Sequence, residues 1–467
     1  MGTLITRVRQ PGHERITKMD ASIERQKRSR WRCGALAAIA LALPTVLAAQ
    51  RSSPRLDSLI AQAIAVQPSL KAVQARVDAA HARGRSAGTL DDPMVGIGVM
   101  NLPVNGRGYD DMTMNAVSLQ QALPFPKRLR LQREQAAAEA RALEAASSPL
   151  RANIERDVRR AYYELAFLDG AMAVLAESQT VTTALIQSSE SRYAAGLARQ
   201  EEVLRLQVEA ARIAEEAARF AEERRAALAQ LNALLARPSD AAIDASGIPE
   251  AIKRAAVPAN AAEIRFASSA LGSRVLDTPL PPVATLQATA AVNNPERREF
   301  DARLAVETSR LRLAEQAHEP RFDVELQYGQ RPGRSDMVSL MVSSPIPIRR
   351  NARQNQEIAA VRSELSAVQS DRAAQVQEVN AEIATLHSEL EAIRSQLALY
   401  VRSILPQGRA VFESTAAGYA AGRADFPSLL ESRRSLFEYQ LGFERLIADF
   451  ARKLAELERL VGTGVLL

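Results

Sequence analysis

Residues 345–422 open with Pro-Ile-Pro-Ile-Arg-Arg, close with Gly-Tyr-Ala-Ala-Gly, and contain a single proline, Pro406, after residue 347. Their apolar residues recur at alternating steps of three and four, with one phase slip near Arg372. This heptad pattern predicts a helix packed along its length against another helix. A helix over 349–420 would be about 105 Å long, which exceeds the width of an ordinary globular core. The apolar positions are Ile358, Val361, Leu365, Val368, Val376, Val379, Ile383, Leu386, Leu390, Ile393, Leu397, Tyr400 and Ile404.

The same features occur earlier in the chain. Val-Ser-Leu followed by Pro-x-Pro occurs at 117–126 and again at 338–347, and Tyr-Ala-Ala-Gly occurs at 193–196 and at 419–422. We therefore predict a tandem duplication of about 225 residues. Each copy reads as helix, two short strands, very long helix, tight turn and returning helix. The predicted segments are a first repeat over 49–237 with a hairpin at 92–122 and a tip at 193–197, a connector over 238–282, and a second repeat over 283–467 with a hairpin at 320–345 and a tip at 419–425.

The first 48 residues read as a signal peptide with an N-terminal extension. They hold nine Lys and Arg and three Asp and Glu, which accounts for the whole net charge of +6, so the remainder is neutral and nucleic-acid binding is not favoured. Cations at 27–32 precede an apolar run over 35–47, and small residues at 46–48 suit cleavage. Met19 offers an alternative start, and an uncleaved anchor is the alternative reading. Cys33, the single cysteine, would leave with the leader, which predicts a mature chain without a disulfide or a lipid-bearing cysteine.

Two stretches in each repeat alternate apolar and polar residues and predict β-hairpins. Residues 94–100 and 112–120 form the first pair, and residues 321–328 and 338–342 form the second. One face of each strand is apolar, which fits either a half-buried soluble sheet or a membrane barrel. Four strands cannot close a membrane barrel, but a trimer would supply twelve and leave no edge unpaired in lipid. The trimeric barrel is therefore the favoured hypothesis.

The predicted helices carry two further signals. We expect a first helix over 56–82, a bend in the first long helix at Pro149, and returning helices over 199–236 and 427–461. Cations mark the start of both long helices, where they oppose the helix dipole. Anionic lipid head groups, carboxylates of a neighbouring subunit and plain solvation all remain open as reasons for these cations. They are Lys127, Arg128 and Arg130 in the first repeat, and Arg349, Arg350 and Arg353 in the second.

The sequence contains no recognisable catalytic arrangement. Its four His share no metal-ligand spacing, and no Ser-His-Asp set, phosphate loop or Cys cluster occurs, so we expect no enzyme and no cofactor. Six of the nine Met lie in the strand regions. Alternation places Met94, Met100, Met337 and Met341 opposite the apolar face, where thioethers facing a lumen would suit soft ions such as Cu(I) or Ag(I). Packing by an adaptable side chain is the alternative interpretation.

The duplicated units, the Pro-x-Pro sequences and the repeated Tyr-Ala-Ala-Gly turns together resemble the outer-membrane efflux protein family, the TolC-like exit ducts. Asp92-Pro-Met, Asn101-Leu-Pro and Asp111-Met-Thr-Met are similar to the branch associated with heavy-metal efflux. The resemblance implies a mostly α fold with membrane β structure. A homotrimer would form a twelve-stranded β-barrel, with four strands per chain, in the lipid of a Gram-negative outer membrane. A long α-helical barrel would continue it into the periplasm and meet a periplasmic adaptor (membrane fusion protein) and an inner-membrane pump.

The resemblance also implies roles for residues at the helix tips. The tips would contact the adaptor, and acidic residues past the second tip would form the periplasmic gate, although Ser428 stands where some members have an acid. The expected function is a passive exit duct for heavy-metal cations. Alternatives are drug efflux or type I protein secretion through the same duct, and a periplasmic coiled-coil scaffold or adaptor without a barrel. The implied adaptor contacts are Tyr193, Gly196, Leu197, Tyr419, Gly422 and Arg423, and the gate residues are Asp425 and Glu431.

Overall fold

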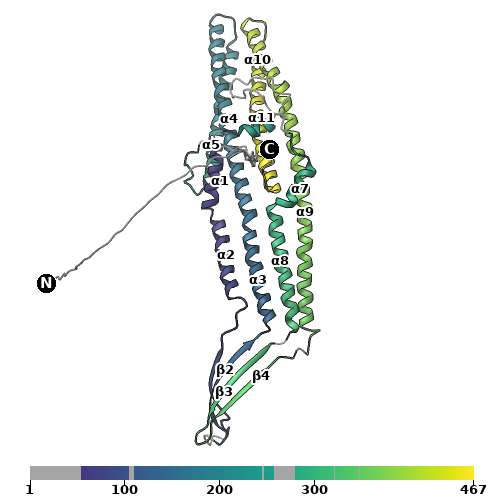
Figure 1. Ribbon diagram of the computed structural model, residues 1–467. Helices are drawn as coiled ribbons and strands as arrows, with labels where there is room; N and C mark the ends of the chain where they lie inside the picture. Colours follow the sequence, from purple (N-terminus) through teal and green to yellow (C-terminus); the bar gives the residue numbers. More distant parts are fainter. Residues whose placement is uncertain are drawn as a thin grey trace, which may run out of the picture. The chain divides into compact units, whose positions relative to one another are not determined.

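The computed structural model describes residues 54–104, 110–243, 247–256, 279–319, 321–346 and 348–466. The predicted leader over 1–48, including Cys33, lies outside the described residues, as do Pro347 and much of the predicted connector. Within these ranges, long helices run side by side and a four-stranded sheet lies at one end of them (Figure 1). None of the helices described there combines the length and the apolarity needed to cross a lipid bilayer.

The two predicted repeats contain matching elements in the same order. Those of the first are α1 (Pro54–Val66), α2 (Pro68–Ser86), β1 (Met94–Met100), β2 (Met114–Leu123), α3 (Pro126–Ala145), α4 (Ser147–Ala194) and α5 (Gln200–Leu234). A short helix, α6 (Glu250–Ala256), lies in the predicted connector. Those of the second are α7 (Val283–Asn293), α8 (Pro295–Glu315), β3 (Phe322–Gln330), β4 (Met337–Ser343), α9 (Gln354–Leu399), α10 (Leu405–Ala420) and α11 (Phe426–Val461).

Each repeat begins with a helix that is broken before a proline. The expectation of one continuous helix over 56–82 is wrong, because Gln67 precedes Pro68 and takes an extended conformation with ψ 118°. Asn294 breaks the second repeat in the same way, with ψ 126°. Its side-chain oxygen accepts a hydrogen bond from the Arg297 N–H at 2.8 Å, and its amide donates to the Leu460 carbonyl at 2.8 Å. The second break therefore caps α8 and ties it to α11.

The long helices are also interrupted. The first is divided at Ala146, three residues before Pro149, into α3 and α4. In the second, α9 begins at Gln354 rather than at Arg349, because residues 348–353 form turns. A π-helical segment, Tyr400–Ile404, separates α9 from α10. It ends two residues before Pro406, whose missing N–H and ring disfavour the ordinary helical hydrogen bond at this point.

The four strands form one antiparallel sheet in the order β1-β2-β3-β4. Both predicted hairpins are present, and the two hairpins also pair with each other, since β2 lies beside β3 from Asn115↔Gln330 to Leu123↔Phe322. This pairing across the predicted repeats was not predicted from the sequence. It leaves β1 and β4 as the outer strands of the sheet.

The main hydrophobic core lies where the two repeats meet. Helix α4 packs against α1, α5 and α11, and α11 packs in turn against α9 and α7. Tyr162, Leu168, Leu231, Leu390 and Phe450 are among the side chains that are almost completely buried there. Burial of each such side chain stabilises the fold by roughly 1.5–3 kcal/mol. This core fixes both repeats to one another, and the sheet and the tips extend from it.

We predict that Gly462→Ala destabilises this junction. Gly462 ends α11 with φ 78°, and a Cβ there would overlap the Asn293 carbonyl and lie 3.2 Å from the Asn294 nitrogen. Left-handed strain and the overlap together should lower the free energy of unfolding by about 2–4 kcal/mol. The midpoint of denaturant unfolding, followed by far-UV circular dichroism, measures this change.

Gly196→Ala provides the matched control, because Gly196 has φ 71° but a Cβ there would have no atom within 4 Å. Its cost should stay at about 1 kcal/mol, from backbone strain alone. Equal losses of unfolding free energy in the two variants would show that overlap with the Asn293 carbonyl adds nothing to the cost of Gly462→Ala.

Candidate functional site: the two-faced sheet and the helix tips

One face of the sheet is apolar across all four strands. The register sets Val95 beside Leu119, and Leu119 beside Leu326, which pairs in turn with Leu340. Residues that pair directly share a face, so these four side chains form one row. Most of this face is exposed, Leu340 by 71% and Ile97 by 84%. The apolar residues of this face are Val95, Ile97, Val99, Val117, Leu119, Leu123, Phe322, Val324, Leu326, Tyr328, Val338, Leu340 and Val342, and the register also places the polar Asn115, Gln121 and Gln330 on it, near its ends.

The opposite face is polar and carries the four methionines singled out in the sequence. Met94 pairs with Gln120, and Met341 pairs with Glu325, which pairs with Gln120. These four residues therefore form a row in which two thioethers flank an amide and a carboxylate. The neighbouring row runs from Gly96 through Ser118 and Gln327 to Ser339. The alternation read from the sequence therefore assigns both faces correctly.

Two neighbouring rows bring methionines together near the end of the sheet away from the helices. Met100 pairs with Met114, and Met337 pairs with Gly329. A Cβ at Gly329 would overlap the Met114 sulfur, so the side chain of Met114 lies over this glycine, beside the strand that carries Met337. The Gln327 amide also contacts the Met100 sulfur. Alternation in the sequence did not identify Met114, because its contact with Gly329 depends on the pairing of β2 with β3.

No group of three or more His, Cys, Asp and Glu side chains among the described residues could hold a metal ion. The polar face therefore offers thioether sulfurs rather than imidazole or carboxylate clusters as ligands. Thioethers are soft ligands and favour Cu(I) over hard divalent cations. Such ligands suit weak, exchangeable contacts with a soft ion.

The two Tyr-Ala-Ala-Gly turns have the same geometry. Gly196 and Gly422 adopt φ 71° and 68°, and the next residues, Leu197 and Arg423, donate their N–H groups to carbonyls five residues back, each at 2.8 Å. This is the Schellman arrangement that ends a helix at a left-handed glycine. Leu197 is 69% exposed. Each tip thus presents a tightly closed turn with exposed side chains.

Tyr419 differs from its counterpart in the first repeat, Tyr193. Tyr193 is 48% exposed, whereas Tyr419 is 5% exposed and packs edge-on against Phe426. The Tyr419 hydroxyl donates a hydrogen bond to the Glu202 carboxylate at 2.6 Å. The Arg192 guanidinium lies 4.7 Å from the Tyr419 ring centroid. Tyr419 therefore contributes little surface to a partner and instead fastens one tip to the other.

Arg192 completes this connection, because it also donates to the Ala420 carbonyl at 2.9 Å. Burial, followed by the hydrogen bond to Glu202, raises the pKa of Tyr419 above its ordinary value of 10.0. Sequence reasoning missed Arg192 and Glu202. In the sequence, the only indication of their role is that Arg192 and Glu202 each lie within a few residues of the first tip. Their hydrogen bonds with the second tip join positions more than two hundred residues apart.

The two predicted gate carboxylates lie in different surroundings. Asp425 caps α11 by accepting a hydrogen bond from the Ser428 N–H at 3.1 Å. Hydrogen bonding from the Ser428 side chain, followed by that from its N–H, holds the pKa of the Asp425 carboxyl below its usual value. Glu431 is exposed and lines a cleft of about 830 Å³ between α10 and α11. Gly408 and Tyr439 also line this cleft. Arg423 is exposed at the tip beside Asp425.

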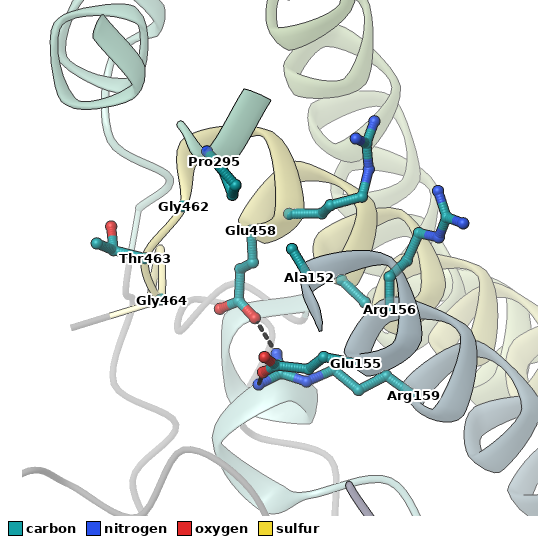
Figure 2. A pocket seen from close by; sticks show the side chains of 11 residues that line it. Ala152, Glu155, Arg156, Arg159, Pro295, Glu458, Gly462, Thr463 and Gly464 are labelled. Carbon is teal, nitrogen blue, oxygen red and sulfur yellow. Dashed lines mark hydrogen bonds and ion pairs between the residues drawn. The ribbon is translucent and has the colours of Figure 1, made fainter. Parts of the chain in front are cut away.

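A small pocket where α4, α8 and α11 meet has a structural role (Figure 2). Arg159 points across it to Glu458, and also forms an ion pair with Glu155 at 2.5 Å. Burial opposes the charge on Arg159, but the two carboxylates outweigh burial and raise its pKa. Glu458 also accepts from the Val465 N–H at 3.1 Å. The pocket is therefore occupied by an ion-pair network that fastens the C-terminal segment to the core.

Part of the chain is similar to a known protein family. The sequence model of the outer membrane efflux protein family matches residues 59–237. A search of curated proteins found no match.

Several solved structures share the fold. The outer-membrane channel OprN superposes with a TM-score of 0.70 at 20% identity, covering 88% of this chain and 91% of its own. The outer membrane protein VceC of Vibrio cholerae gives 0.69 at 19% identity, with 88% and 96% covered. CusC, described as a transmembrane channel, gives 0.70 at 14% identity, with 88% and 92% covered. The predicted fold class is confirmed by these matches: a TolC-like fold with long helices and four strands per chain.

We predict that Tyr419→Phe loosens the contact between the tips. Loss of the bond to the Glu202 carboxylate should speed amide hydrogen exchange at residues 419–425 by about tenfold at neutral pH. Tyr193→Phe is the matched control and should leave exchange unchanged, since the structure gives the Tyr193 hydroxyl no hydrogen bond among the described residues.

The hydrogen bond from Tyr419 to Glu202 should protect the tip only up to alkaline pH. Because the folded-state pKa of Tyr419 is raised, its contribution is complete below pH 10.0 and declines as the pH rises through the higher value. Once the base-catalysed rise in intrinsic exchange is divided out, protection of the wild-type tip should therefore fall at strongly alkaline pH, whereas protection in Tyr419→Phe should not change over this range. A wild-type tip that stays equally protected across this range would contradict the assignment.

Proposed function

We propose that the chain is a passive outer-membrane exit duct of a tripartite efflux system, acting as a homotrimer that extends into the periplasm. The observation that carries this proposal is the sheet, apolar and exposed on one face and polar on the other, at the end of long paired helices (Figure 1). A soluble scaffold or adaptor would leave this apolar face in water. Lipid on one side and an aqueous lumen on the other satisfy both faces.

The open edges of the sheet support the trimer. Within the described residues β1 and β4 each pair with one strand only, and an unpaired backbone edge is unstable in lipid. β4 of one copy beside β1 of the next continues the antiparallel order. Three copies supply twelve strands, which exceeds the smallest membrane barrels of about eight strands.

The tips support a role in docking. Leu197, Tyr193 and Arg423 are exposed at the end of the helices opposite the sheet, where a periplasmic adaptor would meet the duct. Gly196 and Gly422 close the turns that present them. In this proposal the inner-membrane pump supplies the free energy, and the duct supplies a path. Asp425 and Glu431 would form the gate.

We propose heavy-metal cations as the substrate class. Met94, Met100, Met337 and Met341 share the polar face, which would line the lumen, and Met114 adds a fifth thioether near its far end. Soft sulfur ligands spaced along a lumen suit repeated weak contacts with Cu(I) or Ag(I). The alternative functions of the same duct are drug efflux and type I protein secretion, and neither would need these sulfurs.

The membrane barrel is tested by placing one charge on each face. Leu340→Arg puts a cation on the apolar face and should cost about 2–4 kcal/mol per chain in a bilayer. We expect it to abolish the heat-dependent mobility of the folded trimer on a denaturing gel of outer-membrane fractions. Ser339→Arg, one residue away on the polar face, should preserve that mobility. Equal behaviour of the two variants would refute a lipid-facing apolar surface.

The substrate class is tested by growth of a strain lacking the gene. We expect sensitivity to copper and silver salts and ordinary tolerance of lipophilic drugs, with rescue by the intact chain. Gly422→Trp should fail to rescue, because a bulky side chain at φ 68° disrupts the second tip. Sensitivity to drugs alone would contradict metal efflux and favour drugs as the substrate class.

A second arm of this experiment tests the methionines. Replacing Met94, Met100, Met337 and Met341 with Leu keeps their volume but removes their sulfurs. We expect reduced tolerance of copper and silver with a normal amount of folded trimer. Unchanged tolerance would assign the four methionines to packing alone.

A further inference from the structure

The end of the sheet that meets the helices carries a band of cations, which we call the basic collar. It comprises Lys127 and Arg128, in the first turn of α3, and Arg349 and Arg350, in the turn that leads to α9. All four are exposed. β2 ends at Leu123, shortly before the first pair, and β4 ends at Ser343, shortly before the second. Because Leu123 pairs with Phe322, and Asp323 pairs with Ser343, both pairs lie at the same end of the sheet.

The collar is not explained by contacts within the chain. The described residues give none of its four side chains an ion pair or a hydrogen bond. Cations in or just before a first helical turn also oppose the helix dipole, so helix stability does not account for them. The opposite end of the sheet provides the contrast, because there Arg334 pairs with Asp111 at 2.5 Å and Arg331 donates to the Ser335 carbonyl at 2.8 Å.

Exposed apolar side chains accompany the cations. Phe125 lies two residues before Lys127 and is 41% exposed, whereas Ile346 and Ile348 flank Pro347 and are 81% and 87% exposed. A carboxylate from another protein would neutralise the charges but leave these side chains in water. Cations beside exposed aromatic and aliphatic side chains are the pattern of a surface that lies at the boundary between lipid head groups and acyl chains.

We propose that the basic collar binds anionic phospholipids of the leaflet on the helix side of the barrel. The inference rests on the proposed membrane barrel and adds a lipid partner to it. The four cations contact the phosphates, and Phe125, Ile346 and Ile348 enter the adjoining acyl region. Each repeat contributes one pair of collar cations, which follows β2 in the first and β4 in the second. A trimer would therefore present six pairs of cations around the barrel. The collar thereby fixes the depth at which the barrel lies in the bilayer.

The test uses the full chain, purified as a trimer in detergent, with fluorescent phosphatidylglycerol and phosphatidylcholine as probes, and measures binding by anisotropy. We expect the wild type to bind the anionic lipid at least about fivefold more tightly at low salt. High salt should remove the preference, because it screens charges at an exposed surface. Lys127→Gln/Arg128→Gln and Arg349→Gln/Arg350→Gln should each reduce the preference.

Arg331→Gln/Arg334→Gln is the matched control at the other end of the sheet and should retain the preference. Equal affinity of the wild type for both lipids, or an unchanged preference in both collar variants, would overturn the inference. A rival partner is the neighbouring subunit, whose Asp91 and Asp92 precede the edge strand β1. If Asp91→Asn/Asp92→Asn lowers the thermal stability of the trimer as much as Arg349→Gln/Arg350→Gln does, and the two effects are not additive, the cations belong to the subunit interface.

The heat-dependent mobility of each sample separates failure of this inference from failure of the proposed function. A wild-type chain that never shows a folded trimer would refute the barrel itself. A folded wild-type trimer without lipid preference would refute the collar alone.

Discussion

The unpaired edges of the sheet are the constraint on which the rest of the structure depends. The strands β1 and β4 expose backbone N–H and C=O groups on their outer sides, and an apolar face lies between them. A bilayer accepts the face but not the edges, so the single chain is incomplete. In the proposed duct, further copies would close the edges and so determine where each copy places its helices. The long α4 and α9 would then continue the ring of strands as a ring of helices.

In the proposed ring, the two predicted repeats of one chain would supply two adjacent segments. The β2–β3 pairing joins the hairpins of the two repeats, and the core around Tyr162, Leu390 and Phe450 joins their helices. Contacts at the two levels are independent, so the chain is held as one unit both at the sheet and at the centre of the helices. Asn294, with bonds to both α8 and α11, adds a polar link at the same level as the core.

Local patterns predict much of this fold. Heptads reveal the long helices, alternation reveals both sheet faces, and the repeated Gly at 196 and 422 identifies the turns. The sequence does not reveal the pairing of β2 with β3, because strand pairing across two hundred residues leaves no local signal. The burial of Tyr419 is hidden for the same reason, since both tyrosines begin the same Tyr-Ala-Ala-Gly sequence. The helix break at Gln67 was readable, because a residue before proline avoids helical backbone angles.

The two predicted repeats differ in their long helices. A π-helical segment before Pro406, with Tyr439 set against Gly408, interrupts the second long helix, whereas the first continues through α4 without a π-helical turn. Single π-helical turns inside α-helices often occur at functional sites. In the proposed ring, long helices with and without such a turn would alternate, so the helical wall would have two kinds of segment rather than one repeated segment.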